Sequence, residues 1–248
     1  MDINEKKSKD FHRHPWELSR TKCVMNELKK HLAVDKQSKY LNIGAGDLYF
    51  DECWKQIYAK NHETYAVDIG YEHESKNGTT NLYRDLSSVN ESNFDYALMM
   101  DSLEYMTDDF LYVKLLADKV SNGGKLMFTL PAYSSLYSKH DEIVGNLRRY
   151  SFSDFKKLIN RIDNLSIVTW HYFYFSLFCF RFMQKFFKLD IDPSHKVTTG
   201  WKHSEKNIIT RTVVFILDLD YWICKILRIF HFPGLSLFVI CKKNDGVL

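Results

Sequence analysis

The sequence predicts an α/β fold, a doubly wound and mostly parallel sheet, and three features support this prediction. Short apolar runs alternate with helix-like stretches along much of the 248-residue chain. Two glycines one residue apart follow the first run, and acids follow four of the runs. Alternating strands and helices are typical of a parallel sheet covered by helices on both faces.

The first half of the chain supplies most of the expected strands. A helix with an apolar face is predicted over 14–32, before the sheet begins. The clearest later helix is 108–120, where two aspartates at the start suit the helix dipole. The turn Asn122-Gly123-Gly124 introduces the fifth strand. The expected strands are 40–43, 64–69, 80–86, 94–102 and 124–132.

The second half is organised differently. A helix at 151–162, capped by Ser151 or Ser153, precedes a strand at 165–173, and 235–243 is the last strand. If these two strands pair, the aromatic-rich, helical block between them is a large insertion at about 175–232, with a clear helical pattern at 206–230. Long insertions are usually functional, as a lid, a dimer surface or a membrane-facing patch. The domain prediction is an N-terminal helical cap, 1–36, and a main domain, 37–248.

Composition and charge narrow the class of protein. Hydrophobic residues are 45% and charged residues 26%, which suits a globular core, and the net charge of +3 does not argue for nucleic acid. The five cysteines are scattered, so neither a disulfide framework nor a metal site is expected. The charged N-terminal stretch does not resemble a signal peptide, which predicts a cytoplasmic location.

Residues 165–187 raise the question of a membrane. Their apolar run contains His171 and ends at Arg181, whereas a spanning helix needs about 20 apolar residues. Buried structure is the favoured interpretation. The alternative is a peripheral membrane or subunit contact through 170–230, because 208–230 is also amphipathic.

The stretch "NIGAG", 42–46, is the first candidate site. Gly44 and Gly46 lack the Cβ atoms that block close backbone approach. The stretch could bind a nucleotide phosphate or a nucleoside without phosphates, or it could be only a tight turn. Asp47, Asp51 and Glu52 follow closely and would repel a pyrophosphate. A cationic or phosphate-free ligand is therefore favoured.

Acids recur at the ends of the following runs. Asp68 follows the second run, where a carboxylate can accept both hydroxyls of a ribose. The alternative for Asp68 is a turn residue, because Gly70 is close by. Asp85 and Asp101 end the third and fourth runs. Together with Asp47, these acids would surround a nucleoside and a positive centre.

The stretches "YLNIGAGD", "AVDI", "RDL", "FDYALMMDSLEYMTDD" and "NGGKLMFTLPA" resemble the successive motifs of class I S-adenosylmethionine-dependent methyltransferases. The resemblance covers about residues 38–173, with 235–243 as the last strand. It implies a Rossmann-like, seven-stranded sheet whose last strand is antiparallel. It also implies S-adenosyl-L-methionine as the cofactor.

The same resemblance implies which residues hold the cofactor. The turn formed by Gly44, Ala45 and Gly46 would lie under the methionine part. Asp68 would hold the ribose, and Ile69 would pack on the adenine.

Two further pairs belong to this implied set. Asp85 and Leu86 would meet the adenine edge. Asp101 and Ser102 would line the methionine side and the mouth for the substrate.

A narrower resemblance lies outside the core. The stretches "RHPWELSR", 13–20, and 131–155 look like a subgroup of bacterial methyltransferases from surface-glycan and secondary-metabolite gene clusters. Trp16 and Arg20 are on the N-terminal helix, which would close over the site. Trp16 is a candidate substrate contact, and Arg20 is a candidate partner of the methionine carboxylate.

The loop after the fifth strand supplies the candidates for acceptor chemistry. His140 and Asp141 are the candidate general bases, needed if the acceptor is a poor nucleophile such as a sugar hydroxyl. Tyr133 and Tyr150 are candidate linings of the acceptor pocket. Arg148 could fork onto a carboxylate or phosphate of the substrate; an ion pair with Glu142 or Asp154 is the alternative.

The sequence therefore predicts an S-adenosylmethionine-dependent methyltransferase for biosynthesis, O-directed, acting on a small molecule or a carrier-linked glycan or lipid-like intermediate. The alternative is a catalytically inactive methyltransferase-fold binding or interaction module. Its support is Asn42, where the family often has an acid, and the missing third glycine at Leu48. A nicotinamide dehydrogenase ranks last, because acids stand where its pyrophosphate would bind.

Overall fold

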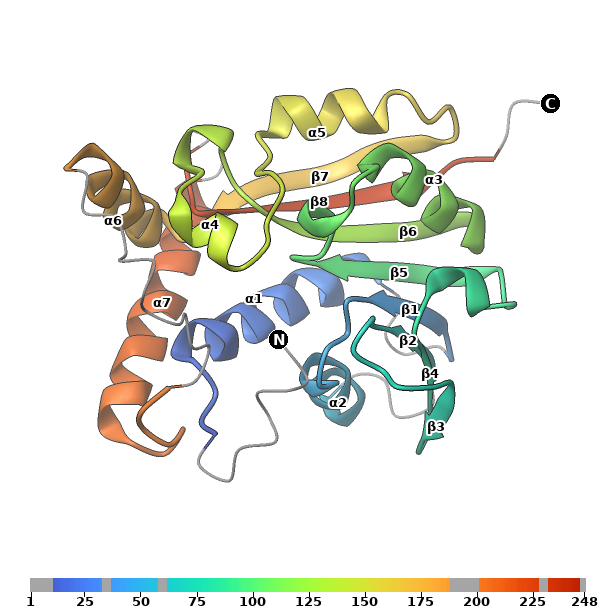
Figure 1. Cartoon of the computed structure of the whole chain (residues 1–248), viewed down its shortest axis with the longest axis horizontal. Helices are drawn as coiled ribbons and strands as arrows, with labels where there is room; N and C mark the ends of the chain where they lie inside the picture. The colour runs from blue at the N-terminus through green and yellow to red at the C-terminus, as the bar shows by residue number, and fades with distance from the viewer. Residues whose placement is uncertain (1–10, 33–36, 58–61, 188–200, 228–231, 246–248) are drawn as a thin grey trace. The chain divides into compact units, whose positions relative to one another are not determined.

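The structure is a computed structural model that describes residues 11–32, 37–57, 62–187, 201–227 and 232–245 (Figure 1). The chain divides into two compact units. The first comprises Met1–Ser88 and Thr198–Ile223, and the second comprises Val89–Val197 and Cys224–Leu248.

The first unit contains four strands in the order β3-β4-β2-β1. β1 is parallel to β2 and β2 is parallel to β4, so the carboxyl ends of these three strands lie at one edge. Only the short β3 runs antiparallel, against β4. The elements of this unit are α1 (Pro15–His31), β1 (Lys39–Ile43), α2 (Tyr49–Ile57), β2 (Glu63–Val67), β3 (Ser75–Asn77), β4 (Thr80–Tyr83), η2 (Leu86–Ser88) and most of α7 (Ile208–Ile226). The part of α7 after Ile223 is counted with the second unit.

The second unit contains the strand order β5-β6-β8-β7. β5 and β6 are parallel, and β8 lies antiparallel between β6 and β7. β7 therefore runs parallel to β6, and α5 packs along it (Figure 1). The elements are β5 (Phe94–Met100), η3 (Leu103–Tyr105), α3 (Asp109–Lys119), β6 (Val120–Pro131), η4 (Ser134–Leu136), α4 (Lys139–Ile143), α5 (Phe152–Ile159), β7 (Leu165–Phe173), α6 (Phe175–Phe186) and β8 (Ser236–Lys243).

The predicted α/β fold is confirmed. Every expected strand is present within a few residues of its predicted range, and β8 is the antiparallel last strand. β3 is an addition to the predicted set. The expected turn at Asn122-Gly123-Gly124 lies instead inside β6, where the pairing with β5 is interrupted by an irregularity and Gly123 has a φ of +78°.

Local sequence explains how several helices begin. Pro15 occupies the first turn of α1, and the side chain of His14 accepts a hydrogen bond from the N–H of Trp16. At α5, Ser151 and Asp154 form a reciprocal capping box, as the predicted cap at Ser151 requires. In both helices the cap supplies partners for backbone groups that helical hydrogen bonds leave over.

The prediction of buried structure for the aromatic stretch is wrong for α6. No residue of α6 is buried, and Phe180 and Phe186 are 61% and 70% exposed. Because β7 and β8 pair, as the insertion prediction required, α6 and α7 both lie in the stretch inserted between them. Among the described residues, no helix has the length and hydrophobicity needed to cross a bilayer. The cap boundary at residue 36 and part of the insertion fall outside the described residues.

Candidate functional site

The turn after β1 is shaped by its two glycines. Gly44 and Gly46 have φ values of +70° and +56°, in the left-handed region that side chains with a Cβ disfavour. The N–H groups of Gly44 and Ala45 both donate to the carbonyl of Val67, at 2.8 and 3.2 Å. The turn is therefore fixed against the end of β2. Two of its three residues have no Cβ to obstruct a ligand.

Asp68, directly after β2, connects this turn to the next one. Its Oδ2 accepts the N–H of Gly46 at 2.8 Å, and its Oδ1 accepts the N–H of Gly70 at 2.9 Å. The second contact is that of a turn residue, and the first braces the glycine turn. Each carboxylate oxygen has more than one lone pair, so both can accept a further hydrogen bond.

The expected rim of three acids is wrong, and Arg13 is the first reason. The guanidinium of Arg13 pairs with Asp47 at 2.5 Å, and the two side chains are 6% and 4% exposed. Arg13 also pairs with Glu17 and lies 3.8 Å from the ring centre of Tyr49. Burial disfavours its charge, but Glu17 and Asp47 raise the pKa of Arg13 overall, so the cation neutralises Asp47.

Asp51 is the second reason, because it is buried inside the unit. It accepts the hydroxyl of Tyr40 at 2.9 Å and the side-chain amide of Asn42 at 2.8 Å. Burial raises the pKa of Asp51 to about 6, although the two hydrogen bonds lower it in part. Glu52 is the exposed acid of the three. The methyltransferases that the sequence resembles often have an acid at the position of Asn42. Here the side chain of Asn42 contacts the carboxylate of Asp51, which comes from α2.

The expected adenine contacts differ in exposure. Ile69 is 80% exposed, whereas Leu86 is 4% exposed at the start of η2. Asp85 is exposed and accepts the N–H of Ser87 at 2.7 Å, and hydrogen bonding from Ser87, first from its side chain and then from its N–H, lowers the pKa of Asp85. The adenine-binding roles of these three residues stay predictions.

Trp16 and Arg20 lie one helical turn apart on α1. The guanidinium carbon of Arg20 is 4.3 Å from the ring centre of Trp16, a cation–π contact. The indole Nε1 of Trp16 is buried and has no hydrogen-bond partner among the described residues. The roles predicted for both residues stay predictions.

Tyr71 is a residue of this region that the sequence did not single out. Its hydroxyl donates to the carbonyl of Gly46 at 2.9 Å, and its ring packs against Ala45, Leu48 and Ala66. Burial, reinforced by nearby carboxylates, raises its pKa, which keeps the hydroxyl a donor. An aromatic residue soon after the acid of the second strand is a weak signal, and nothing in the sequence indicated its target.

The second unit has strained backbone at three strand ends. Asp101, Tyr133 and Tyr174 have positive φ values of +45°, +58° and +65°. They follow β5, β6 and β7, which are parallel, so all three lie at one edge of this unit's sheet. Such strain costs about 1–3 kcal/mol per residue and clusters at functional sites.

Hydrogen bonds hold the first of these strand ends. The N–H of Asp101 donates to the carbonyl of Thr129, and Asp101 Oδ1 accepts the hydroxyl of Thr129 at 3.1 Å. Ser102 is buried, and its hydroxyl donates to the carbonyl of Met100 at 2.9 Å. The two residues therefore have structural contacts here, and their predicted roles at the cofactor stay predictions.

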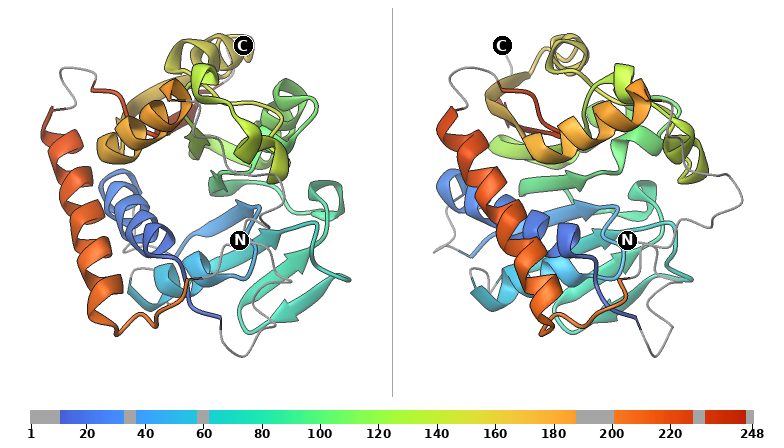
Figure 2. Two further views of the ribbon diagram at one scale, coloured as in Figure 1. Left: turned by 60° about the vertical axis from the view of Figure 1, so that its left-hand side comes forward. Right: turned by 90° about the vertical axis from the view of Figure 1, so that its left-hand side faces the viewer.

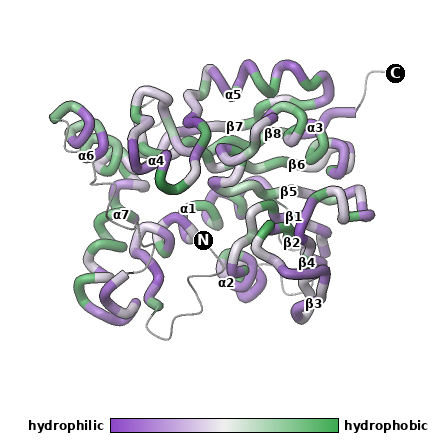
Figure 3. Tube along the Cα trace, in the orientation of Figure 1, coloured by the Kyte–Doolittle hydropathy of each residue, from purple (hydrophilic) through white to green (hydrophobic). Residues whose placement is uncertain are grey.

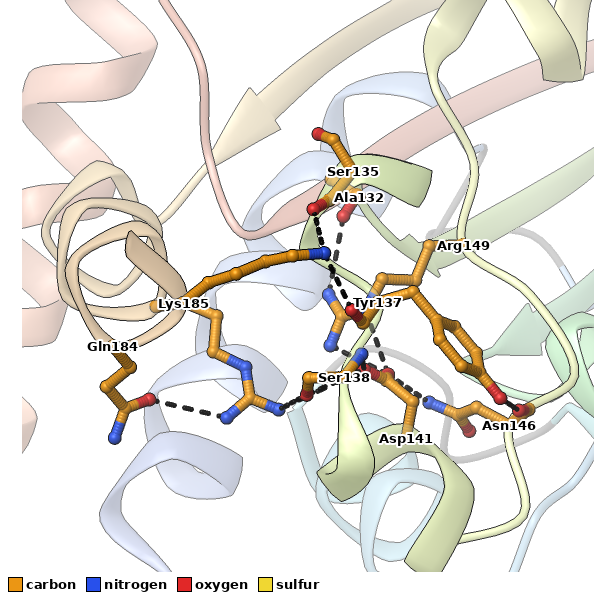
Figure 4. A network of polar contacts seen from close by, with 10 residues as sticks. Ala132, Ser135, Tyr137, Ser138, Asp141, Asn146, Arg149, Gln184 and Lys185 are labelled. Carbon is orange, nitrogen blue, oxygen red and sulfur yellow. Dashed lines mark hydrogen bonds and ion pairs between the residues drawn. The ribbon is translucent and has the colours of Figure 1, made fainter. Parts of the chain in front are cut away.

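Asp141, a candidate base, is the centre of a buried polar network (Figure 4). It is fully buried, pairs with Arg149 at 2.8 Å, and accepts the amide of Asn146 at 3.1 Å. Its second oxygen accepts the N–H of Ser138 at 3.0 Å, which closes a capping box at the start of α4. Burial alone would raise its pKa, but Arg149 and the other donors lower it. These contacts weigh against Asp141 as a base.

Two cations from α6 hold the same loop. The guanidinium of Arg181 donates to the hydroxyl of Ser138 at 2.8 Å, and the ammonium of Lys185 donates to the carbonyls of Ser135 and Tyr137 (Figure 4). The sequence gave no signal for this attachment, because α6 is about 45 residues further along the chain.

His140, the other candidate base, lies on α4 beside this network. Its Nδ1 is buried and has no hydrogen-bond partner among the described residues. Burial lowers the pKa of His140 below its ordinary value, and the charges of Arg181 and Arg149 lower it further, with Asp141 opposing. The imidazole is therefore neutral near pH 7, the form that can accept a proton.

The adjacent residues Arg148 and Arg149 have different partners. Arg149 enters the network, whereas Arg148 pairs with Asp109 at 3.0 Å and donates to the carbonyl of Thr107. Arg148 thus forms an ion pair within the protein, but its partner is Asp109 and not the predicted Glu142 or Asp154.

The two candidate tyrosines are held by packing. Tyr150 is 4% exposed and its hydroxyl donates to Asp109 at 3.0 Å. Tyr133 is half-buried and stacks on Tyr172 with ring centres 4.8 Å apart. Burial raises the pKa of both hydroxyls. Their roles at the acceptor stay predictions.

Comparison with known proteins gives a likeness in structure. No family model matches the chain, and no curated protein matches its sequence. A putative sarcosine dimethylglycine methyltransferase from Galdieria sulphuraria has a TM-score of 0.56 at 13% identity, over 93% of this chain and 87% of the other. A putative methyltransferase from Bacillus halodurans has a TM-score of 0.54 at 12% identity, over 89% and 99%.

A third similar structure includes the cofactor. Phosphoethanolamine N-methyltransferase 2 from Haemonchus contortus, in complex with S-adenosyl-L-methionine, has a TM-score of 0.52 at 13% identity, over 90% of this chain and 52% of the other. At such identities the likeness is one of fold. The chain has the Rossmann-like fold of class I S-adenosylmethionine-dependent methyltransferases.

Proposed function

We propose that the protein is an S-adenosylmethionine-dependent methyltransferase. The observation that carries the proposal is the position of Asp68, at the end of β2 and bonded to the glycine turn through the N–H of Gly46. A carboxylate at this point of a parallel sheet suits a ribose, and a turn without Cβ atoms suits close approach of the rest of the cofactor. The fold supports the same cofactor.

Residues of the first unit would hold the cofactor. Asp68 accepts the ribose hydroxyls with the lone pairs that Gly46 and Gly70 leave over. Gly44, Ala45 and Gly46 form the floor for its methionine part. When bound, the cofactor supplies a methyl group on a sulfonium, which an acceptor can take by in-line displacement.

Residues of the second unit would serve the acceptor. We assign His140 to take the proton of an acceptor hydroxyl, because its imidazole is neutral and one of its nitrogens carries a free lone pair. Asp141 then positions the loop through Arg149 and Ser138. The network holds the start of α4, the helix that carries His140, and alignment of the reacting groups supplies much of the acceleration in such displacements.

The proposed acceptor is a hydroxyl of a small molecule or of a carrier-linked glycan or lipid-like biosynthetic intermediate. The resemblance of residues 13–20 and 131–155 to the glycan and secondary-metabolite subgroup supports this choice. The exposed apolar side chains of α6, on a helix that also holds the loop of His140, are compatible with an acceptor that carries an apolar tail.

Calorimetric titration with S-adenosyl-L-methionine tests the proposal. Asp68→Ala should weaken binding roughly tenfold to a hundredfold, because charge-assisted hydrogen bonds contribute about 1.5–3 kcal/mol. Asp68→Asn keeps the size and one acceptor oxygen, so its affinity should fall between. Asp163→Ala removes an exposed carboxylate elsewhere and should bind like the native chain.

The same titration separates the proposal from its alternative, an inactive binding module. A native chain that binds neither the cofactor nor its demethylated product would favour the module. Asn42 was the main support for that alternative, and the carboxylate of Asp51 now stands beside it. Unchanged affinity in Asp68→Ala would remove the proposed ribose site even if the cofactor binds.

A further inference from the structure

The solvent face of α7 is apolar along the whole helix. Figure 3 shows hydrophobic residues over most of its length. Ile208, Phe215 and Ile226 are 72%, 67% and 72% exposed, and Leu219 at mid-helix is 50% exposed. A helix on the surface of a folded chain usually turns its polar face outward. The exposed large apolar residues are Ile208, Ile209, Phe215, Ile216, Leu219, Trp222, Ile223 and Ile226.

The opposite face of α7 explains this orientation. In both views of Figure 2, α7 lies alongside α1. Asp218 accepts the hydroxyl of Ser19 at 2.6 Å and pairs with Lys22, and the hydroxyl of Tyr221 donates to Glu27. Val214, Leu217 and Cys224 of α7 are also buried, so the helix has an apolar face on each side. Rotating it would break the contacts with α1 and would expose these residues in place of the present ones.

The spacing of the exposed residues is that of a helix–helix seam. Thr212, Phe215, Leu219, Trp222 and Ile226 follow one another at intervals of three and four residues. This is the spacing that places side chains along the line where two helices pack. Arg211 is the charged residue of α7 that lies on the exposed side, near its start.

We propose that α7 is the interface with a second copy of this chain, in which the two α7 helices pack along this seam around Leu219. Eight large apolar residues of this helix are 47–72% exposed, and a contiguous apolar patch of this kind marks an interaction surface. A patch of one copy that meets the same patch of another forms a closed, two-fold dimer.

Charge favours a second copy over a lipid surface. Helices that lie on membranes are rich in Lys and Arg on their polar face. The charges of α7 are balanced instead, with Arg211 and Lys225 against Asp218 and Asp220. Asp218 contacts α1 and Asp220 is buried, and with two bases against two acids α7 carries no net positive charge that would favour anionic headgroups.

Sedimentation velocity of the full chain tests the proposal. The native chain should sediment as a dimer at micromolar concentration, and Leu219→Glu should sediment as a monomer. Leu115→Glu is the matched control, because Leu115 is 47% exposed at the middle of α3. It should remain dimeric. A monomeric native chain, or a Leu219→Glu variant that stays dimeric, would overturn the proposal.

A crosslinking variant keeps the test decisive if Leu219→Glu fails to fold. Leu219→Cys should form an intermolecular disulfide on mild oxidation, which doubles the mass on a non-reducing gel, whereas Leu115→Cys should not. Equal crosslinking of the two variants would contradict the seam. So would a native chain that stays monomeric but sediments with vesicles of anionic phospholipid, since that result assigns the face to a membrane.

Discussion

The turn after β1 and the loop after β6 use their carboxylates differently. Residues 44–46 donate backbone N–H groups to the carbonyl of Val67 and the side chain of Asp68. Residues 132–150 combine backbone hydrogen bonds with a network of side chains, in which Asp141 is buried among Arg149, Asn146 and Ser138. The carboxylate of Asp68, beside the turn, can still accept hydrogen bonds from a ligand. The carboxylate of Asp141, in the loop, is buried and already has partners on both oxygens.

This difference shows that a carboxylate's function depends on what has already satisfied it. Asp68 accepts one N–H on each oxygen and keeps lone pairs for a ribose. Asp141 accepts charged and neutral donors on both oxygens and is fully buried. A buried, paired carboxylate stabilises a geometry, and for this reason we propose its neighbour His140 as the base.

The largest expected effect concerns that assignment. His140→Ala should lower kcat/KM about 10²- to 10⁴-fold, the usual contribution of a general base, while Lys139→Ala next to it should change little. Labelled methyl transfer to fractions of the source cell measures the rate. If the activity survives in His140→Ala, His140 is not the base.

The pH dependence sharpens the same point. A protonated imidazole cannot accept a proton, so activity should be flat above pH 7 and fall as pH drops through a pKa below 6.5. Arg181→Gln removes a charge that disfavours the imidazolium, so the fall should move to higher pH. If the fall moves to lower pH or stays in place, Arg181 does not act on His140.

The next effect tests the network itself. Arg149→Ala leaves the buried Asp141 with the more distant guanidinium of Arg181, 3.9 Å away, and should lower the free energy of unfolding by up to about 3–5 kcal/mol. Arg148→Ala breaks a partly exposed pair with Asp109 and should cost less than about 1 kcal/mol. Urea unfolding of both variants measures the difference. Equal losses of unfolding free energy would contradict the description of Arg149 as the buried partner of Asp141 and Arg148 as the more exposed partner of Asp109.

The smallest effect tests the carboxylate buried near the glycine turn. The pKa of Asp51 is raised from 3.8 to about 6, so the folded chain binds more protons than the unfolded chain between these values. The contribution of Asp51 to the free energy of unfolding is largest below pH 3.8. It falls by about 2–3 kcal/mol as the pH rises from 3.8 through about 6.

Asp51→Asn is the reference for this measurement. The unfolding free energy of the native chain, minus that of Asp51→Asn, should fall as pH rises from 4 to 7. A difference that rises with pH would show a carboxylate stabilised in its charged form, opposite to the burial described.

The fold was predictable because its signals are local. Apolar runs, the glycine turn and the caps at Pro15 and Ser151 each act within a few residues, so strands and helices fall near their expected ranges. The glycines at 44 and 46 adopt the left-handed backbone that glycine permits. Asp68 contacts the turn, as a strand-end acid in a parallel sheet should.

The errors have a common cause in distant partners. Asp47 and Asp51 were read as an open acidic rim, but Arg13 pairs with one, and Tyr40 and Asn42 enclose the other. Residue type states that a group can be charged, whereas burial and pairing decide whether it is available.

The exposed helices α6 and α7 show that the sequence also does not state which partner covers an apolar face. Aromatic and aliphatic periodicity in α6 and α7 correctly indicated helices, and it wrongly favoured burial for α6. A pattern of apolar residues predicts that a face will be covered, without stating whether the cover belongs to the same chain. For α7 the proposed cover is a second copy.

The measurement that bears most directly on the account is a crystal structure with S-adenosyl-L-homocysteine. The account predicts the ribose hydroxyls within hydrogen-bond distance of Asp68 and the amino-acid part against the turn of Gly44 and Gly46. A ligand bound away from that turn, or one whose ribose has no contact with Asp68, would contradict it.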